Sequence, residues 1–260
     1  MRAVIVAAGM GRRLQPYTDE MPKCLVPVAG RPILVRQLEA FRAHGGVDDV
    51  VIVRGYKADV LERRKGELGP GVRFVENRDF ETNNILQSLF KAEAELSGSF
   101  FFTYADIVFE PEVVAELLAA PGDIALIVDR DFRTVYEGRT DHPLPEAEVC
   151  ELDTRGGVAK VGKRAVPVER AWGEFIGLAR FSAAGARAMT DAWRALKASY
   201  RGREEAPFQR APHFRVAYLT DLLQHLIDSG VTVTPVPIFG RWREIDTVQD
   251  LERASAAIRW

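Results

Sequence analysis

A loop dense in glycine and arginine follows the apolar segment Arg2–Ala7 at the start of the chain. Small residues in a loop let backbone N–H groups approach phosphate oxygens closely, and arginine side chains add charged hydrogen-bond donors. The preceding segment is predicted to be a buried strand, and ligands of open α/β sheets bind where such strands end. The residues of this loop are therefore candidates for holding phosphate groups: Ala7, Ala8, Gly9, Met10, Gly11, Arg12 and Arg13.

This loop excludes two common phosphate-binding motifs. A dinucleotide-binding fingerprint requires a third glycine where Leu14 stands. A Walker A loop requires a lysine directly after its last glycine, but Gly11 is followed by Arg12. The loop thus predicts phosphate binding of another kind.

Acidic residues at two later points are candidate ligands of a magnesium ion. Asp106 follows the aromatic segment Ser99–Tyr104, and Asp246 lies two residues after Glu244 on an extended segment, so that these two side chains face the same way. Mg²⁺ prefers carboxylate and phosphate oxygens and usually takes only one or two ligands from the protein. The alternative for Asp246 is that it caps the N-terminus of the last helix.

Strands and helices alternate through the first half of the chain. Apolar runs predict strands, and helical spacing of apolar residues predicts helices between them. The alternation predicts a mostly parallel sheet that is covered by helices on both faces. The expected elements are Arg2–Ala7, Pro32–His44 (stopped by Gly45-Gly46), Val50–Val53, Lys57–Leu68, Val72–Glu76, Asn84–Leu96, Ser99–Tyr104, Glu112–Ala120 and Ile124–Asp129.

The second half is less regular. A polar, irregular segment covers Asp131–Pro145, and a hairpin is expected over Val149–Lys163. The remaining elements are a strand at Phe175–Phe181, helices at Ala183–Tyr200 and Leu219–Ser229, a strand at Val231–Val236 and a helix at Val248–Ile258.

The composition limits the classes of partner. The chain has 260 residues and a formal net charge of −2, so it has no general attraction for nucleic acid or anionic lipid. Its two cysteines, Cys24 and Cys150, form neither a disulfide framework nor a metal motif, and no apolar run reaches the length of a membrane span. We therefore expect a cytoplasmic protein without nucleic-acid or membrane partners, which holds anionic ligands through local positive groups.

The stretch from Val4 to Leu34 resembles the signature of the sugar-phosphate nucleotidyltransferase superfamily. The matching positions include Gly9-x-Gly11-x-Arg13-Leu14, then Pro22-Lys23-x-Leu25-x-Pro27 and finally Gly30-x-Pro32-Ile33-Leu34. The resemblance implies backbone contacts to the nucleotide from the glycine loop, a grip on the triphosphate by Arg13, and binding of the attacked α-phosphate by Lys23. A solvated loop lysine is the alternative for Lys23. The resemblance also implies that Asp106 and Asp246 hold Mg²⁺, with Glu244 beside them.

The segment Thr82-Asn83-Asn84 resembles the choline-phosphate and phosphonate cytidylyltransferase branch of this superfamily. Asparagine amides offer both donors and acceptors, which suits the edge of a pyrimidine base. Ser88 lies one helical turn after Asn84 and joins the candidates for nucleotide binding. The alternative is that Thr82 or Asn83 caps the helix that follows.

Candidate acceptor-binding residues lie in the second half. Hexose-specific members tend to carry a Glu-Lys pair where this chain has Gly162-Lys163, so the resemblance keeps Lys163 as a phosphate binder but removes a carboxylate that binds sugar. Glu174 lies near Trp172 and Phe175, and a carboxylate among aromatic rings favours a cationic amine. The two aromatic residues are equally well explained as core. Further candidates for this pocket, without a ranking, are Tyr136, Arg139, His142 and Tyr218.

These observations predict one three-layer α/β domain over residues 1–260, Rossmann-like and of GT-A type, with a mixed, mostly parallel sheet and an inserted β-rich element. Residues 1–130 are expected to bind the nucleotide, 131–240 the acceptor, and 241–260 to supply metal ligands and a closing helix. The expected reaction joins CTP to a small phospho- or phosphono-alcohol and releases pyrophosphate, with Mg²⁺. The alternatives are a sugar-1-phosphate transferase that uses UTP, dTTP or GTP, and an inactive nucleotide-binding regulatory module. A homo-oligomer is compatible with the sequence.

Overall fold

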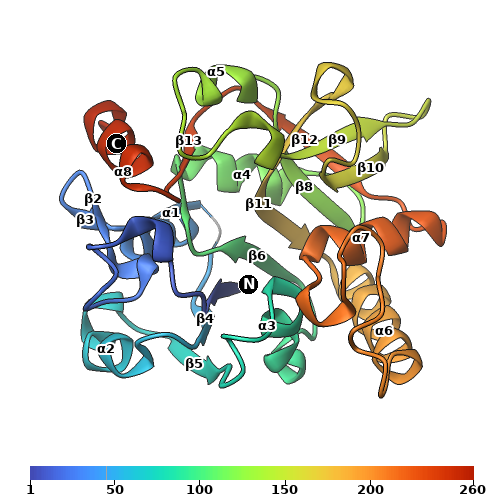
Figure 1. Cartoon of the computed structure of the whole chain (residues 1–260), viewed down its shortest axis with the longest axis horizontal. Helices are drawn as coiled ribbons and strands as arrows, with labels where there is room; N and C mark the ends of the chain where they lie inside the picture. Colours follow the sequence, from blue (N-terminus) through green and yellow to red (C-terminus); the bar gives the residue numbers. More distant parts are fainter. Residues whose placement is uncertain (45) are drawn as a thin grey trace.

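The computed structural model describes residues 1–44 and 46–260. A nine-stranded mixed sheet forms the centre, with helices on both of its faces (Figure 1). The strands of this sheet are β1 (Arg2–Ala7), β4 (Asp49–Arg54), β5 (Val72–Glu76), β6 (Phe100–Tyr104), β8 (Ile124–Asp129), β9 (Glu148–Leu152), β10 (Val158–Lys163), β11 (Gly173–Phe181) and β12 (Thr234–Ile238). The helices are α1 (Ile33–His44), α2 (Ala58–Arg63), α3 (Ile85–Lys91), α4 (Pro111–Ala119), α5 (Phe132–Tyr136), α6 (Ala183–Ser199), α7 (Leu219–Asp228) and α8 (Val248–Ala257).

The first half forms the parallel part of the sheet, in the order β6-β1-β4-β5. Alternate side chains of β1 enter two separate cores, because successive residues of a strand point to opposite faces. Ile5 packs in the core that includes α1 and α4, and Val4 packs in the core that includes α3 and α6. Both faces of β1 are apolar, as the continuous run Arg2–Ala7 predicts for a strand covered on both sides.

The second half adds antiparallel strands around β11. This strand pairs antiparallel with β6, β8 and β9, and the hairpin β9–β10 forms one edge of the sheet. The mixed sheet and the inserted β-rich element confirm the predicted fold class.

A two-stranded ribbon outside the main sheet brings the two candidate metal-binding segments together. β7 (Ile107–Phe109) pairs antiparallel with β13 (Trp242–Glu244), and the N–H of Ile245 donates to the carbonyl of Asp106 at 2.8 Å. Neither strand was predicted, because three-residue segments carry too little periodicity to recognise. The ribbon places Asp106 and Asp246 on neighbouring chain segments.

Several predicted boundaries differ from the structure. The helix expected over Lys57–Leu68 is α2 followed by a 3₁₀ turn, and the helix expected over Asn84–Leu96 is α3 followed by another 3₁₀ turn. The strand expected over Val231–Val236 is β12, which begins three residues later and ends two residues later, and the irregular segment Asp131–Pro145 contains the short helix α5. Of the predicted stop Gly45-Gly46, Gly45 lies outside the described residues.

The C-terminal helix α8 packs against the N-terminal loop and lies near the hairpin of β2 (Pro27–Val28) and β3 (Arg31–Pro32) (Figure 1). Thr247 caps this helix: its side chain accepts from the N–H of Asp250, whose carboxylate accepts from the N–H of Thr247. The alternative that Asp246 is the cap is therefore wrong, and its carboxylate is available to the site. Over residues 1–44 and 46–260, no helix is long and apolar enough to span a membrane.

Candidate active site

The glycine-rich loop forms one wall of a cavity of about 260 Å³ at the end of β1. Gly11 has a φ of 60°, and a Cβ atom there would lie 2.9 Å from the Cβ of Lys23, so that only glycine fits this close approach. Two of the predicted residues, Ala8 and Met10, do not line the cavity; the carbonyl of Ala8 accepts from the N–H of Tyr56 at 3.0 Å. The predicted residues that line it are Ala7, Gly9, Gly11, Arg12, Arg13, Lys23, Asp106 and Asp246.

Lys23 joins the two aspartates at the floor of this cavity. Its ammonium donates to Oδ2 of Asp106 at 2.9 Å and also pairs with Asp246, which pairs in turn with Arg13. Burial lowers the pKa of Lys23, but the two carboxylates more than offset this effect, so the pKa is raised. Conversely, burial raises the pKa of Asp246, but Lys23 and its other partners hold it well below the usual range. Lys23 is thus a permanent cation at this position, not the solvated loop lysine of the alternative.

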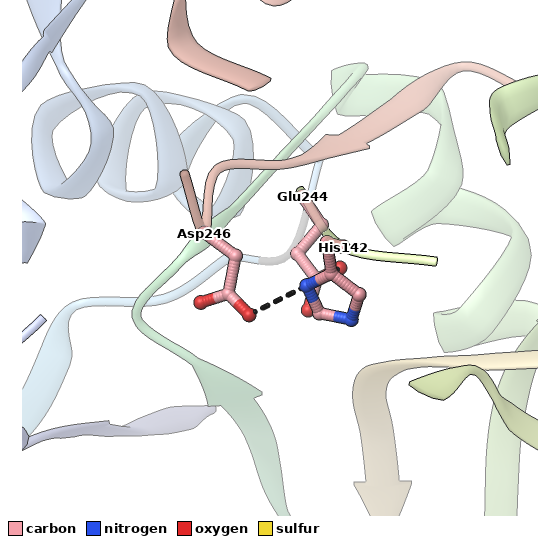
Figure 2. A group of neighbouring side chains, drawn as sticks. All are labelled: His142, Glu244 and Asp246. Atoms are coloured by element: carbon pink, nitrogen blue, oxygen red, sulfur yellow. Dashed lines mark ion pairs between the residues drawn. The ribbon is translucent and has the colours of Figure 1, made fainter. Parts of the chain in front are cut away.

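Asp106 has free coordinating capacity that suits a hard cation. Oδ1 of Asp106 is buried and has no hydrogen-bond partner among the described residues. A carboxylate oxygen can only accept, and carboxylate oxygens are the ligands that Mg²⁺ prefers. Asp246 also belongs to a cluster with Glu244 and His142, whose ligand atoms all lie within 4.8 Å of one another (Figure 2). The donor set fits a divalent cation.

His142 and Arg139 lie at this end of the cleft, although the sequence suggested them for the acceptor pocket. Nδ1 of His142 is 2.8 Å from Oδ2 of Asp246 (Figure 2). Arg139 donates to Glu244 at 2.7 Å. Arg139 also donates to Asp250 at 2.6 Å, which ties this loop to the start of α8. These partners are more than a hundred residues apart in the chain, so that no spacing in the sequence marks them.

A second cavity, of about 210 Å³, adjoins the first. Arg13, Asp106 and Asp246 line both cavities, and they therefore stand at the junction. The predicted acceptor residues Lys163, Glu174 and Tyr218 line the second cavity, and so do four aromatic side chains: Tyr104, Phe175, Tyr218 and Trp242.

Tyr136 and Trp172, which were also predicted near the acceptor, lie outside the lining of the second cavity. Tyr136 does not line the second cavity but donates its hydroxyl to Oε1 of Glu174 at 2.8 Å. Trp172 is not part of the lining either; the guanidinium of Arg130 lies 4.2 Å from the centre of its ring. Glu174 is buried, its Oε2 has no partner among residues 1–44 and 46–260, and burial raises its pKa well above the usual value.

Glu148 is a buried carboxylate of the second cavity that sequence reasoning missed. Its oxygens accept from the hydroxyls of Tyr104 at 3.0 Å and Thr220 at 3.4 Å. Burial raises its pKa to about 7, although Lys163 opposes the shift. The available signal was an acidic residue directly before the apolar pair Val149-Cys150.

Two of the predicted base-reading residues, Asn83 and Ser88, accept hydrogen bonds from the same side chain, that of Asn77. Asn77, fully buried after β5, donates to Asn83 and to Ser88, each at 2.9 Å, and neither Asn83 nor Ser88 lines the two cavities. Asn84 lines the second cavity, and its side-chain oxygen Oδ1 caps α3 by accepting from the N–H of Ile85 at 2.9 Å. The N-cap of α3 is thus Asn84, and not Thr82 or Asn83 as the alternative expected. Base reading by Asn83, Asn84 and Ser88 stays a prediction.

Comparison with known proteins places this arrangement in a family. The model of the MobA-like NTP transferase domain matches residues 3–233. The CTP:phosphoglutamine cytidylyltransferase of Campylobacter jejuni subsp. jejuni is 30% identical over 97% of this chain and 98% of its own length. The 2-aminoethylphosphonate cytidylyltransferase of Lancefieldella rimae is 30% identical over 71% of this chain and 68% of its own.

Relatives of the sugar-phosphate class and a solved structure also match. A glucose-1-phosphate thymidylyltransferase of Streptomyces griseus is 30% identical over 96% of this chain and 64% of its own length. The structure of CTP:phosphocholine cytidylyltransferase from Streptococcus pneumoniae shares the fold, with a TM-score of 0.72 and 21% identity over 98% of this chain and 97% of that one. The superfamily and the branch predicted from the sequence are confirmed, and the chain belongs to the family of MobA-like NTP transferase domains.

Proposed function

We propose that this chain is a Mg²⁺-dependent cytidylyltransferase that joins CTP to a small phosphorylated or phosphonylated alcohol and releases pyrophosphate. The observation that carries the proposal is the junction of the two cavities, where Lys23 and Arg13 meet Asp106 and Asp246. Nucleotidyl transfer requires positioning and charge stabilisation more than covalent chemistry, and a cluster of this kind supplies both. The names of the cytidylyltransferase relatives support CTP as the donor and a phosphoryl or phosphonyl group as the acceptor.

In the proposed reaction an anionic oxygen of the acceptor attacks the α-phosphorus of CTP. The bond between that oxygen and the α-phosphorus forms, and the bond from the α-phosphorus to the bridging oxygen of the β-phosphate breaks. The electron pair leaves with pyrophosphate. The acceptor is already anionic, so that no strong general base is needed. Lys23 binds the α-phosphate, and Arg13 binds the triphosphate.

Asp106 and Asp246 would hold Mg²⁺, with Glu244 beside them. A bound Mg²⁺ neutralises charge on the α-phosphoryl group and on the leaving pyrophosphate. His142 and Arg139 orient Asp246 and Glu244 through the contacts described above. We place the enzyme in the cytoplasm, and we propose that neither nucleic acid nor a membrane is a partner.

The acceptor cavity is suited to a phosphorylated molecule with a cationic end. Lys163 provides a positive charge at its wall, whereas Glu174 and Glu148 provide carboxylates among aromatic side chains. Burial disfavours the charged form of both carboxylates, and a bound ammonium group would restore it. A hexose phosphate offers no such cation.

A pyrophosphate-release screen tests the proposal. Each NTP is combined with phosphocholine, aminoalkylphosphonates, hydroxyalkylphosphonates and hexose 1-phosphates. We expect kcat/KM for CTP to exceed that for UTP by roughly tenfold to a hundredfold, because a donor–acceptor swap on the base leaves buried groups unpaired at about 1–3 kcal/mol each. Equal use of UTP and CTP, or a hexose 1-phosphate as the best acceptor, would favour the sugar-phosphate class instead. Absence of turnover with every pair would favour an inactive nucleotide-binding module.

A further inference from the structure

A third cavity, of about 540 Å³, opens beside the acceptor cavity and is the largest of the three. The two share Glu146, Lys163 and Tyr218 in their linings, so that a ligand can extend from one into the other. The transfer of a nucleotide to a short phospho-alcohol requires no group that lines this outer cavity alone. Its further lining residues are Gly162, Arg164, Arg210, Ala211, Pro212, Thr220 and Asp221.

Positive charge exceeds negative charge in the outer cavity. Its three cations are Lys163, Arg164 and Arg210, and its two carboxylates are Glu146 and Asp221. Glu146 lies 3.1 Å from Nζ of Lys163 and 3.7 Å from the guanidinium of Arg164, and thus offsets part of both charges.

Arg210 is the cation in this cavity with capacity to bind an anion. Its guanidinium donates to the carbonyl of Val161 at 3.2 Å, and within the described part of the chain no carboxylate lies within 4.0 Å of it. The carboxylate of Asp221 is used by backbone groups, accepting from the N–H of Tyr218 at 2.8 Å and of Arg210 at 3.1 Å. A guanidinium presents several donors in a fixed plane, which matches the two oxygens of a carboxylate.

Unusual backbone conformations on two separate turns place these cations. Arg164, at the end of β10, has a φ of 55°, and Gln209, directly before Arg210, has a φ of 52°. Gly162 has a φ of 125°, and a Cβ there would lie 3.3 Å from the Cβ of Thr220 and 3.8 Å from Nη1 of Arg210. Residue 162 thus lies between Thr220 and the guanidinium of Arg210, and its positive φ favours glycine.

The carboxylate of Glu148 lies in the acceptor cavity, which adjoins the outer cavity that holds Arg210. Thr220 lines the outer cavity and donates to Glu148, a carboxylate of the acceptor cavity, at 3.4 Å. The acceptor cavity thus holds the carboxylate of Glu148, the outer cavity holds the guanidinium of Arg210, and Lys163 lines both. A buried acid followed by an open guanidinium is complementary to an ammonium group followed by a carboxylate, which is the pattern of an α-amino acid.

We propose that the acceptor is a phosphorylated or phosphonylated amino acid, whose carboxylate binds Arg210 and Arg164 in the outer cavity while its ammonium group binds Glu148. This inference rests on the proposed cytidylyl transfer and specifies its acceptor. The phosphoryl or phosphonyl end of such a molecule enters the junction where Lys23 lies. A simple amino alcohol phosphate would leave Arg210 without an anion.

Pairs of acceptors that differ only in a carboxylate test the proposal. Phosphoserine is phosphoethanolamine with one added carboxylate, and 2-amino-3-phosphonopropanoate is 2-aminoethylphosphonate with the same addition. Longer ω-phosphono-α-amino acids and their aminoalkylphosphonate counterparts cover other distances between the two charged ends. With CTP, we expect the carboxylated member of the best-fitting pair to have at least a tenfold higher kcat/KM.

Arginine variants link that preference to the outer cavity. Arg210→Gln should lower the ratio between the two members at least fivefold, mainly through the KM of the carboxylated member, and Arg164→Gln should lower it less. Arg210→Lys should fall between wild type and Arg210→Gln, because it keeps the charge but loses the planar donors. Arg155→Gln, in the turn at the far end of the same hairpin, serves as the matched control and should leave the ratio unchanged. Thermal unfolding of each variant checks that it is folded.

Failure of this inference differs from failure of the proposed function. Equal kcat/KM for both members of every pair, or an unchanged ratio in folded Arg210→Gln, would overturn the amino-acid acceptor and leave cytidylyl transfer intact. Absence of turnover with CTP and every phosphorylated acceptor would count against the transfer itself. In that case calorimetric titration of the enzyme with phosphoserine and with phosphoethanolamine decides the subsite, since equal affinities, or no binding of either, would refute it.

Discussion

Two buried carboxylates at opposite ends of the cleft, Asp246 and Glu148, have different hydrogen-bond partners. At the reaction end, Asp246 contacts the cations Lys23 and Arg13 as well as His142. At the acceptor end, Glu148 accepts from the hydroxyl groups of Tyr104 and Thr220, and among the described residues no other group donates to it. Glu174 likewise accepts from the hydroxyl of Tyr136, and its other oxygen has no partner within residues 1–44 and 46–260.

This difference determines when each end is charged. The cations hold the pKa of Asp246 well below its usual range, so that this carboxylate is ionised at every physiological pH. Burial raises the pKa of Glu148 to about 7 and that of Glu174 well above its usual value. Asp246 at the reaction end is therefore permanently charged, whereas Glu148 and Glu174 at the acceptor end become charged when a cation arrives or when the pH rises.

Loss of a carboxylate at the reaction end should have the largest effect. Asp106→Asn and Asp246→Asn should each lower kcat by roughly a hundredfold or more, because each weakens a cation clamp on transition-state charge. Steady-state kinetics with varied Mg²⁺ measures the effect, and Asp59→Asn on the exposed face of α2 is the control. Full activity in EDTA, or near-normal turnover of Asp106→Asn, would remove the metal assignment.

Loss of the bridging cation should come next. Lys23→Ala should lower kcat/KM by about a hundredfold, because the transition state loses a preorganised charge. Turnover is counted per folded molecule, since the change also leaves the carboxylates of Asp106 and Asp246 without this partner. Lys65→Ala removes an exposed lysine outside the cleft and is the control. If turnover per folded molecule is unchanged and only the thermal midpoint falls, Lys23 is structural.

The acceptor end should respond to pH where the reaction end does not. Glu148 ionises as the pH rises through about 7, so the KM of an acceptor with an ammonium group should fall roughly tenfold between pH 6 and pH 8. Glu148→Gln should flatten this dependence, while the titration of the acceptor's own phosphate remains in both proteins. Parallel pH profiles for wild type and variant would show that Glu148 does not bind the cation.

The smallest effect is expected where the two cavities meet at the start of α3. Asn84→Ala should reduce stability by about 1 kcal/mol, since it removes the cap of this helix. Chemical denaturation measures the change, and Thr82→Ala, which removes an exposed hydroxyl two residues earlier, is the control. A loss confined to the preference for CTP over UTP, without a loss of stability, would identify Asn84 as a base reader instead of a cap.

Local patterns were sufficient for most of the strands and helices. The apolar run before Gly9 predicted β1 with its bounds, and Ile124–Asp129 was likewise predicted without error. Such signals depend on neighbouring residues: periodicity, a strand end, or a glycine where backbone must come close. The family, and the assignment of Lys23, Asp106 and Asp246 to one site, came from the resemblance of the sequence to a known signature. The extent of a single domain over residues 1–260 stays a prediction.

Only the tertiary structure decided which of these groups touch. The β7–β13 ribbon brings Asp106 beside Asp246, and the loop with Arg139 and His142 reaches the same place from the inserted half. Contacts of this kind join segments 105 to 233 residues apart, and their closure depends on sheet pairing and core packing, which leave no periodic trace in the sequence. Burial is a property of the same folded state and affects both Asp246 and Glu148, and it is the contacts of Asp246 with Lys23 and Arg13 that separate the ionised Asp246 from the poised Glu148.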